Sequence, residues 1–152
     1  MRGGRGATGV RRGGTDAMLA GLLPLLVVLV MGFVLLSGRS VTPSIVETAD
    51  SLSVSSWGYA RTLAYAAIDS VTLRRNLDGL GKRRDGMQSG NAYVGWFDLA
   101  PYGRTQLFVD AAKRPFVVVH PREGATVVLS AADSAAATAL AMRLRERTGG
   151  GR

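Results

Sequence analysis

The chain of 152 residues has no cysteine and a single histidine, His120. The lack of cysteine excludes disulfides, cysteine-ligated zinc, a thiol nucleophile and a lipid-modified N-terminal cysteine. One histidine excludes a metal site built from several histidines and a catalytic centre that needs more than one. We therefore expect no metal and no cofactor, and the length is that of a single domain.

Charge is also missing from a long stretch near the N-terminus. Residues 1–16 are rich in Gly and Arg and have no apolar period, so they predict a disordered basic tail. Residues 17–37 carry no charge over 21 positions. As a helix they would span roughly 32 Å, enough for a hydrocarbon core of about 30 Å. A cleaved signal peptide is disfavoured because Leu36 stands where cleavage needs a small residue. The segment predicts an uncleaved transmembrane helix.

The flanking charges predict the orientation of this helix. Arg2, Arg5, Arg11 and Arg12 precede the span, whereas only Arg39 follows it closely. The positive-inside rule then keeps the N-terminus in the cytoplasm and places the C-terminal domain outside it. A twin-arginine export signal at Arg11 and Arg12 is disfavoured because two glycines follow.

The net charge of +8 divides between two parts of the chain. Residues 1–39 hold five basic residues and one acidic residue, and residues 40–152 hold fourteen and ten. Half of the excess is therefore an orientation signal and needs no anionic ligand. Within the second part, the basic residues gather in a predicted loop, 74–90, and they are Arg74, Arg75, Lys82, Arg83 and Arg84.

Short alternating apolar runs follow the predicted span. Residues 38–50 read as a linker that contains Pro43, which blocks helix continuation. Seven predicted strands then lie at close spacing, over residues 51–55, 59–65, 68–73, 91–99, 102–109, 116–120 and 125–129. Tight turns between them indicate an antiparallel sheet that closes on itself.

The apolar period changes at the C-terminus. Ser130 and Asp133 fit a capping box that would start a helix. Beyond them a narrow apolar stripe falls at helical spacing on Ala137, Leu140, Ala141 and Leu144. We expect one amphipathic helix that closes the open end of the sheet, followed by a disordered tail over 148–152.

Several stretches of the predicted β region resemble the bacterial pleckstrin-homology-like (PH-like) domains that follow membrane helices. The similar segments are Trp57-Gly-Tyr59, Ile68–Leu73, Gly95–Leu99, Gly103–Val109 and Pro115–Ser130. The resemblance implies a seven-stranded antiparallel barrel over residues 51–147, capped by one C-terminal helix. Many members carry two membrane helices before the domain, whereas this chain has one, which reverses the side that the domain faces.

Residues with reactive side chains are scattered rather than clustered. No Gly-x-Ser-x-Gly motif accompanies His120, which ends an apolar strand before a turn. The segment Gly79–Gly86 superficially looks like a phosphate loop, but no apolar strand precedes it and no helix follows. Nucleic acid is disfavoured because no basic stripe with interleaved aromatics appears. The pattern predicts a protein that is not an enzyme; a small-molecule hydrolase centred on His120 stays as a third hypothesis.

Two binding hypotheses remain. The first is protein–protein interaction at the membrane surface, through a sheet edge or the barrel mouth. The second is recognition of anionic lipid headgroups by the basic residues between 74 and 84. The alternative interpretation of these residues is a solvated hairpin loop that binds no ligand. The large aromatic residues are expected in the core and rim of the barrel rather than in a ligand cage, and they are Trp57, Trp96, Phe97 and Phe108.

Overall fold

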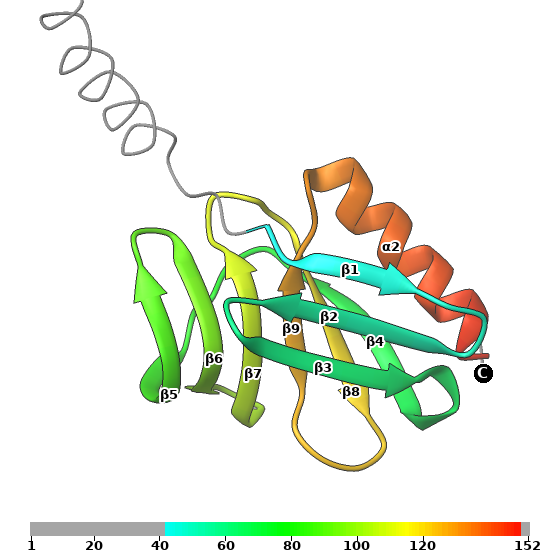
Figure 1. Ribbon diagram of the computed structural model, residues 1–152, viewed down its shortest axis with the longest axis horizontal. Helices are drawn as coiled ribbons and strands as arrows, with labels where there is room; N and C mark the ends of the chain where they lie inside the picture. The colour runs from blue at the N-terminus through cyan, green and yellow to red at the C-terminus, as the bar shows by residue number, and fades with distance from the viewer. Residues whose placement is uncertain (1–41, 150–152) are drawn as a thin grey trace, which may run out of the picture. The chain divides into compact units, whose positions relative to one another are not determined.

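The structure, a computed structural model, describes residues 42–149, which form a mainly β domain with one C-terminal α-helix (Figure 1). The first strands are β1 (Ser44–Glu47), β2 (Ser51–Ser56) and β3 (Tyr59–Ala64), and a 3-10 turn, η1 (Tyr65–Ala67), follows them. The remaining elements are β4 (Ile68–Arg74), β5 (Leu80–Ser89), β6 (Ala92–Leu99), β7 (Gly103–Asp110), β8 (Phe116–Pro121), β9 (Val127–Ser130) and α2 (Ser134–Arg147). The prediction of a mainly β domain that ends in one helix is confirmed.

The predicted tail 1–16 and membrane span 17–37 lie outside the described residues. Between residues 42 and 149, no helix is both long enough and apolar enough to cross a bilayer.

The strands form two sheets. The first is an antiparallel meander in the order β1-β2-β3, and the second has six strands in the order β4-β8-β9-β7-β6-β5. In Figure 1 the three-stranded sheet runs across the strands of the larger one. The prediction of seven strands in one antiparallel sheet is therefore wrong in strand number and in one pairing, because β9 lies parallel to β7. All four residues of β9 are buried, so its pattern marks a central strand but carries no information on direction.

The central strands of the six-stranded sheet, β7, β8 and β9, are buried on both faces. In β8, Val117 and Val119 belong to a first core, whereas Phe116 and Val118 belong to a second core on the opposite face. Alternate side chains of a strand point to opposite faces, so a continuous apolar run needs cover on both sides. This requirement decides where the other elements pack.

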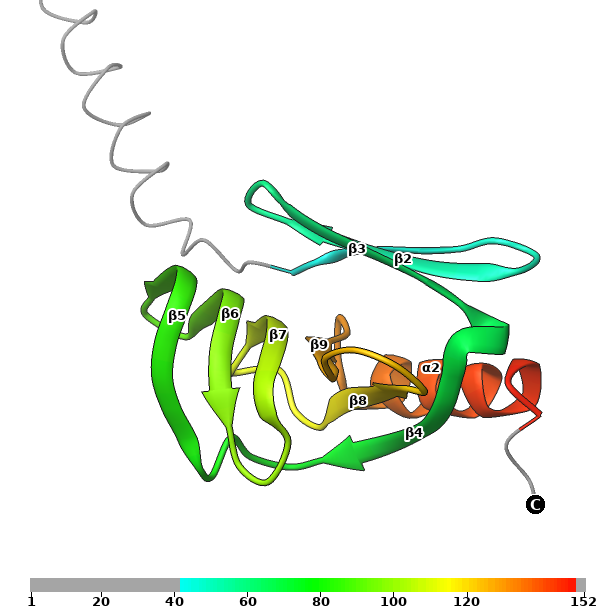
Figure 2. The same cartoon turned by 90° about the horizontal axis from the view of Figure 1, so that it is seen from below.

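The first core is covered by the three-stranded sheet and α2 (Figure 2). The inward residues of the small sheet and the predicted helical stripe all belong to it, and they are Leu52, Val54, Leu63, Ala137, Leu140, Ala141 and Leu144. The predicted stripe is confirmed, since each of its four residues is at most 2% exposed.

The second core is covered in part by the connection from β4 to β5. β4 and β5 are consecutive in sequence but lie at opposite edges. Figure 2 shows the connection between them running below the sheet. Leu77 of this connection packs against the second core together with Leu80 and Tyr102.

The helix begins three residues later than the predicted capping box requires. Asp133 is the N-cap, and its carboxylate accepts a hydrogen bond from the Ala136 N–H at 2.8 Å. Ser130 instead ends β9, where its hydroxyl accepts from the Asp110 N–H at 2.9 Å. Because Ser130 still belongs to β9, the helix begins after it and is capped by Asp133.

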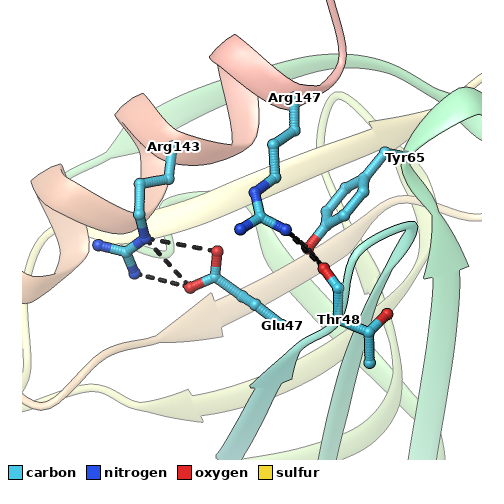
Figure 3. A network of polar contacts seen from close by, with 5 residues as sticks. All are labelled: Glu47, Thr48, Tyr65, Arg143 and Arg147. Carbon is cyan, nitrogen blue, oxygen red and sulfur yellow. Dashed lines mark hydrogen bonds and ion pairs between the residues drawn. The ribbon is translucent and has the colours of Figure 1, made fainter.

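Arginines of α2 tie the helix to the end of β1 (Figure 3). The Arg143 guanidinium lies 2.7 Å from the Glu47 carboxylate, and its hydrogen bond to this carboxylate raises the pKa of the guanidinium. Arg147 donates to the Thr48 carbonyl and the Tyr65 hydroxyl, with its guanidinium 5.2 Å from the Tyr65 ring. A partly exposed ion pair contributes at most about 1 kcal/mol, so the network positions the helix more than it stabilises the fold.

Two strands arise where the sequence pattern predicts none. β1 lies inside the predicted linker 38–50, so the folded domain begins before residue 51. β5 occupies most of the predicted loop 74–90. Both are edge strands of their sheets, and β5 carries charges and glycines in place of apolar alternation. Charged residues and glycines are common in edge strands, and a strand of this composition cannot be recognised from apolar alternation.

Two facing glycines bring β5 and β6 unusually close. Gly86 pairs with Gly95, whose φ is +116°. A Cβ on Gly95 would lie 2.5 Å from the Asp85 carbonyl oxygen and 2.5 Å from the Gly86 Cα. Neither contact can be relieved by rotation of a side chain, so the pairing of β5 requires glycine here.

We predict that Gly95→Ala lowers the free energy of unfolding by about 2–4 kcal/mol, through the clash with β5 and the unfavourable φ. Gly90→Ala is the matched control, because Gly90 also has a positive φ, +55°, but open space around its Cβ. The control should lose only about 1 kcal/mol. Urea unfolding of the full chain in nonionic micelles measures both, and equal losses would contradict the close approach.

Candidate functional site

The five basic residues singled out from the sequence do not form one cluster. Arg74 ends β4 and donates to the Ala100 carbonyl at 3.1 Å and to the Asp78 carbonyl. Its guanidinium also lies 5.5 Å from the centre of the Tyr102 ring. Arg74 therefore holds the β4–β5 connection against the β6–β7 turn, and its donors are engaged within the domain.

Arg84 is also engaged within the domain. Its Nε lies 2.9 Å and its Nη2 2.8 Å from the same carboxylate oxygen of Asp98 on β6. The hydrogen bond to this carboxylate raises the pKa of the guanidinium. Since both side chains keep contact with water, the pair adds little stability. It does fix the direction of Arg84 across the β5–β6 pair.

Lys82 and Arg83 differ from these two. Both are exposed on β5, and neither side chain makes a hydrogen bond or ion pair with another residue of the described range 42–149. β5 forms one edge of the six-stranded sheet, so one side of its backbone has no strand beside it within that range. The ladder to β6 is irregular around Arg83 and regular from Asp85 to Ser89. Two free cations therefore lie at the start of an open edge.

An aromatic and charged patch lies beside this edge. Trp96 and Asp98 alternate along β6 with the buried Phe97, so they lie on the opposite face of the sheet from it. The Arg104 guanidinium of β7 stacks 4.5 Å from the centre of the Trp96 ring. We call this region the β5 surface. It consists of the half-buried Trp96 and four exposed cations, Lys82, Arg83, Arg84 and Arg104.

The hairpin of β2 and β3 borders this patch. The Tyr59 hydroxyl donates to the Asp85 carboxylate at 3.0 Å, and this hydrogen bond raises the pKa of the tyrosine. Figure 1 shows β5 and β6 extending to the left of the three-stranded sheet, which crosses the other strands. The outer part of the larger sheet is thus left open to solvent on this face.

The four large aromatic residues singled out from the sequence differ in their exposure to solvent. Phe97 and Phe108 are at most 1% exposed, which confirms their prediction as core residues. Trp57, at the turn between β2 and β3, is 50% exposed. The sequence predicts Trp96 for the core or rim of the barrel and does not single out Arg104. The buried Phe97 next to Trp96 is the sign that Trp96 faces the other way.

His120 is a packed residue of β8. Its ring nitrogens lie 3.4 Å from the hydroxyls of Thr72 and Thr126, and its ring centre lies 5.0 Å from that of Tyr102. Burial lowers the pKa of His120 below its ordinary value. Within the part of the chain that the structure describes, no three His, Asp or Glu side chains come together as a metal site would need.

Comparison of the chain with models of known protein families, with characterised proteins and with solved structures finds no match.

The lowered pKa of His120 predicts a pH dependence of stability. Below about pH 6.5, His120 binds fewer protons in the folded protein than in the unfolded chain. The free energy of unfolding is therefore unaffected by His120 above about pH 6.5 and falls as the pH drops below that value. His120→Gln should remove this part of the decline between pH 7 and 5. Urea unfolding of both proteins across this range measures it, and parallel curves would contradict the assignment.

Proposed function

We propose that the domain is a non-enzymatic protein-binding module that adds an extended acidic segment of a partner protein to β5. The observation that carries this proposal is the ten-residue edge strand β5, whose Lys82 and Arg83 side chains have no ion-pair partner among residues 42–149. An edge strand offers a row of free N–H and C=O groups, and an extended segment satisfies them by pairing alongside.

Charge selects the chemistry of the partner. On and beside the edge, Lys82, Arg83, Arg84 and Arg104 outnumber Asp85 and Asp98, which leaves a net charge of +2. Carboxylates on an added strand would lie opposite these cations. Cross-strand pairs of opposite charge contribute roughly 0.2–1 kcal/mol each. An acidic strand is therefore favoured over a neutral one.

The same charges disfavour pairing of β5 with a second copy of itself. Two identical edges would bring like charges together, which opposes edge-to-edge association. The irregular ladder around Arg83 adds to this protection, because bulges bend a strand away from flat pairing. The edge thus excludes its own copy while it accepts a segment of opposite charge.

Trp96 and Arg104 supply the side-chain part of the interface. Aromatic residues and arginine are enriched at the centres of protein interfaces, where they bury large areas at low entropic cost. The stacked pair lies one and two strands inward from the edge. Side chains of an added strand on that face would pack toward it.

The cellular setting stays a prediction from the sequence. We propose that the predicted span 17–37 anchors the module and that the domain acts at the membrane surface, outside the cytoplasm. The likeness to PH-like domains is supported only as far as a mainly β domain with a C-terminal helix, and the parallel β7–β9 pair departs from an antiparallel barrel. Headgroup binding by residues 74–84 is less favoured, because Arg74 and Arg84 are engaged internally.

Selection of peptides tests this function. Random twelve-residue peptides are displayed against the full chain in nonionic micelles, and we expect enrichment of acidic sequences rich in β-branched residues. The double variant Lys82→Gln/Arg83→Gln should weaken the selected peptides about tenfold, since two cross-strand pairs of about 0.7 kcal/mol are lost. Fluorescence anisotropy measures the dissociation constants.

Arg122→Gln is the matched control, because Arg122 is an exposed arginine at the end of β8, away from the β5 edge, and should leave binding unchanged. Selected peptides without acidic residues, or equal affinity for the double variant, would contradict the proposal. If no peptide is selected and the full chain, but not the double variant, binds anionic phospholipid in mixed micelles, the headgroup hypothesis replaces it.

A further inference from the structure

A second basic region lies away from the β5 surface, where β4, β8 and α2 meet. A groove of about 600 Å³ opens there, and its lining residues are Leu73, Arg75, Arg114, Pro115, Ser134 and Thr138. Its volume is within the range of small-molecule sites, about 300–1,000 Å³. Arg75 was selected from the sequence as a binding residue, whereas Arg114 was not.

The charge of this groove is uncompensated. Two arginines line it and no carboxylate does. Elsewhere in residues 42–149, ion pairs to carboxylates are made by Arg84, Arg122 and Arg143. Arg114 donates through Nε to the Ala111 carbonyl at 3.1 Å, and its terminal nitrogens have no hydrogen-bond partner among residues 42–149. Two positive charges that line one groove favour an anionic ligand in it.

We propose that this groove binds a phosphate monoester. A single guanidinium satisfies a planar carboxylate with two parallel hydrogen bonds, whereas a phosphate offers three oxygens and a charge of about −1.5 to −2. Two arginines from different segments, one after β4 and one before β8, match that charge. The Ser134 hydroxyl, on a third element, is a further donor in the groove wall.

The apolar part of the wall favours an organic ester over the free ion. Leu73 is 37% exposed and lines the groove together with Pro115. Burial of an apolar group against them contributes roughly 25 cal/mol per Å² of area removed from water. The Thr138 hydroxyl donates to the Ser134 carbonyl, so it is already satisfied and adds no specificity.

NMR titration of the full chain in dodecyl maltoside micelles tests the site, with phenyl phosphate, inorganic phosphate and benzoate as probes. We expect phenyl phosphate to shift the amide signals of Arg75, Arg114 and Ser134 and to bind more tightly than inorganic phosphate. Arg75→Gln and Arg114→Gln should each weaken it about tenfold. Arg83→Gln, on the β5 edge, should not change it.

Two further results separate the sources of the phosphate. Displacement of phenyl phosphate by dihexanoyl phosphatidic acid, but not by the matching phosphatidylcholine, assigns the site to a lipid. Binding of phenyl phosphate without such displacement assigns it to a soluble ester. Benzoate that binds as tightly as phenyl phosphate, or affinity unchanged in both arginine variants, would overturn the proposal. Because Arg83 is outside this groove, failure here leaves the β5 proposal standing, and the reverse also holds.

Discussion

Burial of the central strands of the six-stranded sheet on both faces is the constraint from which the rest of the architecture follows. β8 and β9 are apolar along their whole central length, so neither of their faces can meet water. The small sheet and α2 cover one face, and the connection from β4 to β5 covers part of the other. That connection places β5 at the far edge of the sheet. The covering sheet contacts it there through the hydrogen bond from Tyr59 to Asp85, and the outer backbone edge of β5 has no neighbouring strand between residues 42 and 149. The exposed edge is therefore a consequence of how the core is closed.

Many arginines of the domain serve the fold. Arg74 donates to backbone carbonyls of two connections, and Arg145 donates to the Val71 carbonyl at 2.8 Å. Arg143 and Arg147 bind the end of β1 and the turn after it. Arginine suits this work because its planar fork reaches several carbonyl oxygens at once and stays charged. Much of the positive charge of residues 42–149 is thus engaged in holding the fold together. The four cations on which the proposals rest are Arg75, Lys82, Arg83 and Arg114.

These remaining cations mark two separate places. Lys82 and Arg83 lie on an open backbone edge, where hydrogen bonding and charge act together. Arg75 and Arg114 line a groove, where shape and charge act together. Both depend on the same core, since β4, β5 and β8 are strands of one sheet.

Much of the fold could be predicted from the sequence because its buried strands and helix leave periodic patterns. The stripe from Ala137 to Leu144 and the runs in β6 and β8 are of this kind. β1 and β5 could not be recognised in this way, since edge strands exchange apolar alternation for charge. The parallel pairing of β9 depends on tertiary packing and leaves no local pattern.

The candidate sites were predictable only in part. Lys82, Arg83 and Arg75 attract attention through clustered charge alone. Trp96, Arg104 and Arg114 are isolated in sequence, and only the folded sheet brings them beside the others. The sequence also grouped Arg74 and Arg84 with the binding residues, because a run of basic residues does not show which of them have partners in the fold.

Hydrogen exchange of β5 tests the central claim most directly. If an acidic extended segment pairs with this strand, amide exchange over residues 80–89 in the full chain should slow strongly when a selected acidic peptide is bound, because outward N–H groups gain hydrogen-bond partners. The three-stranded sheet should keep its rates. Protection confined to another region, or unchanged exchange in β5 at saturating peptide, would contradict the account.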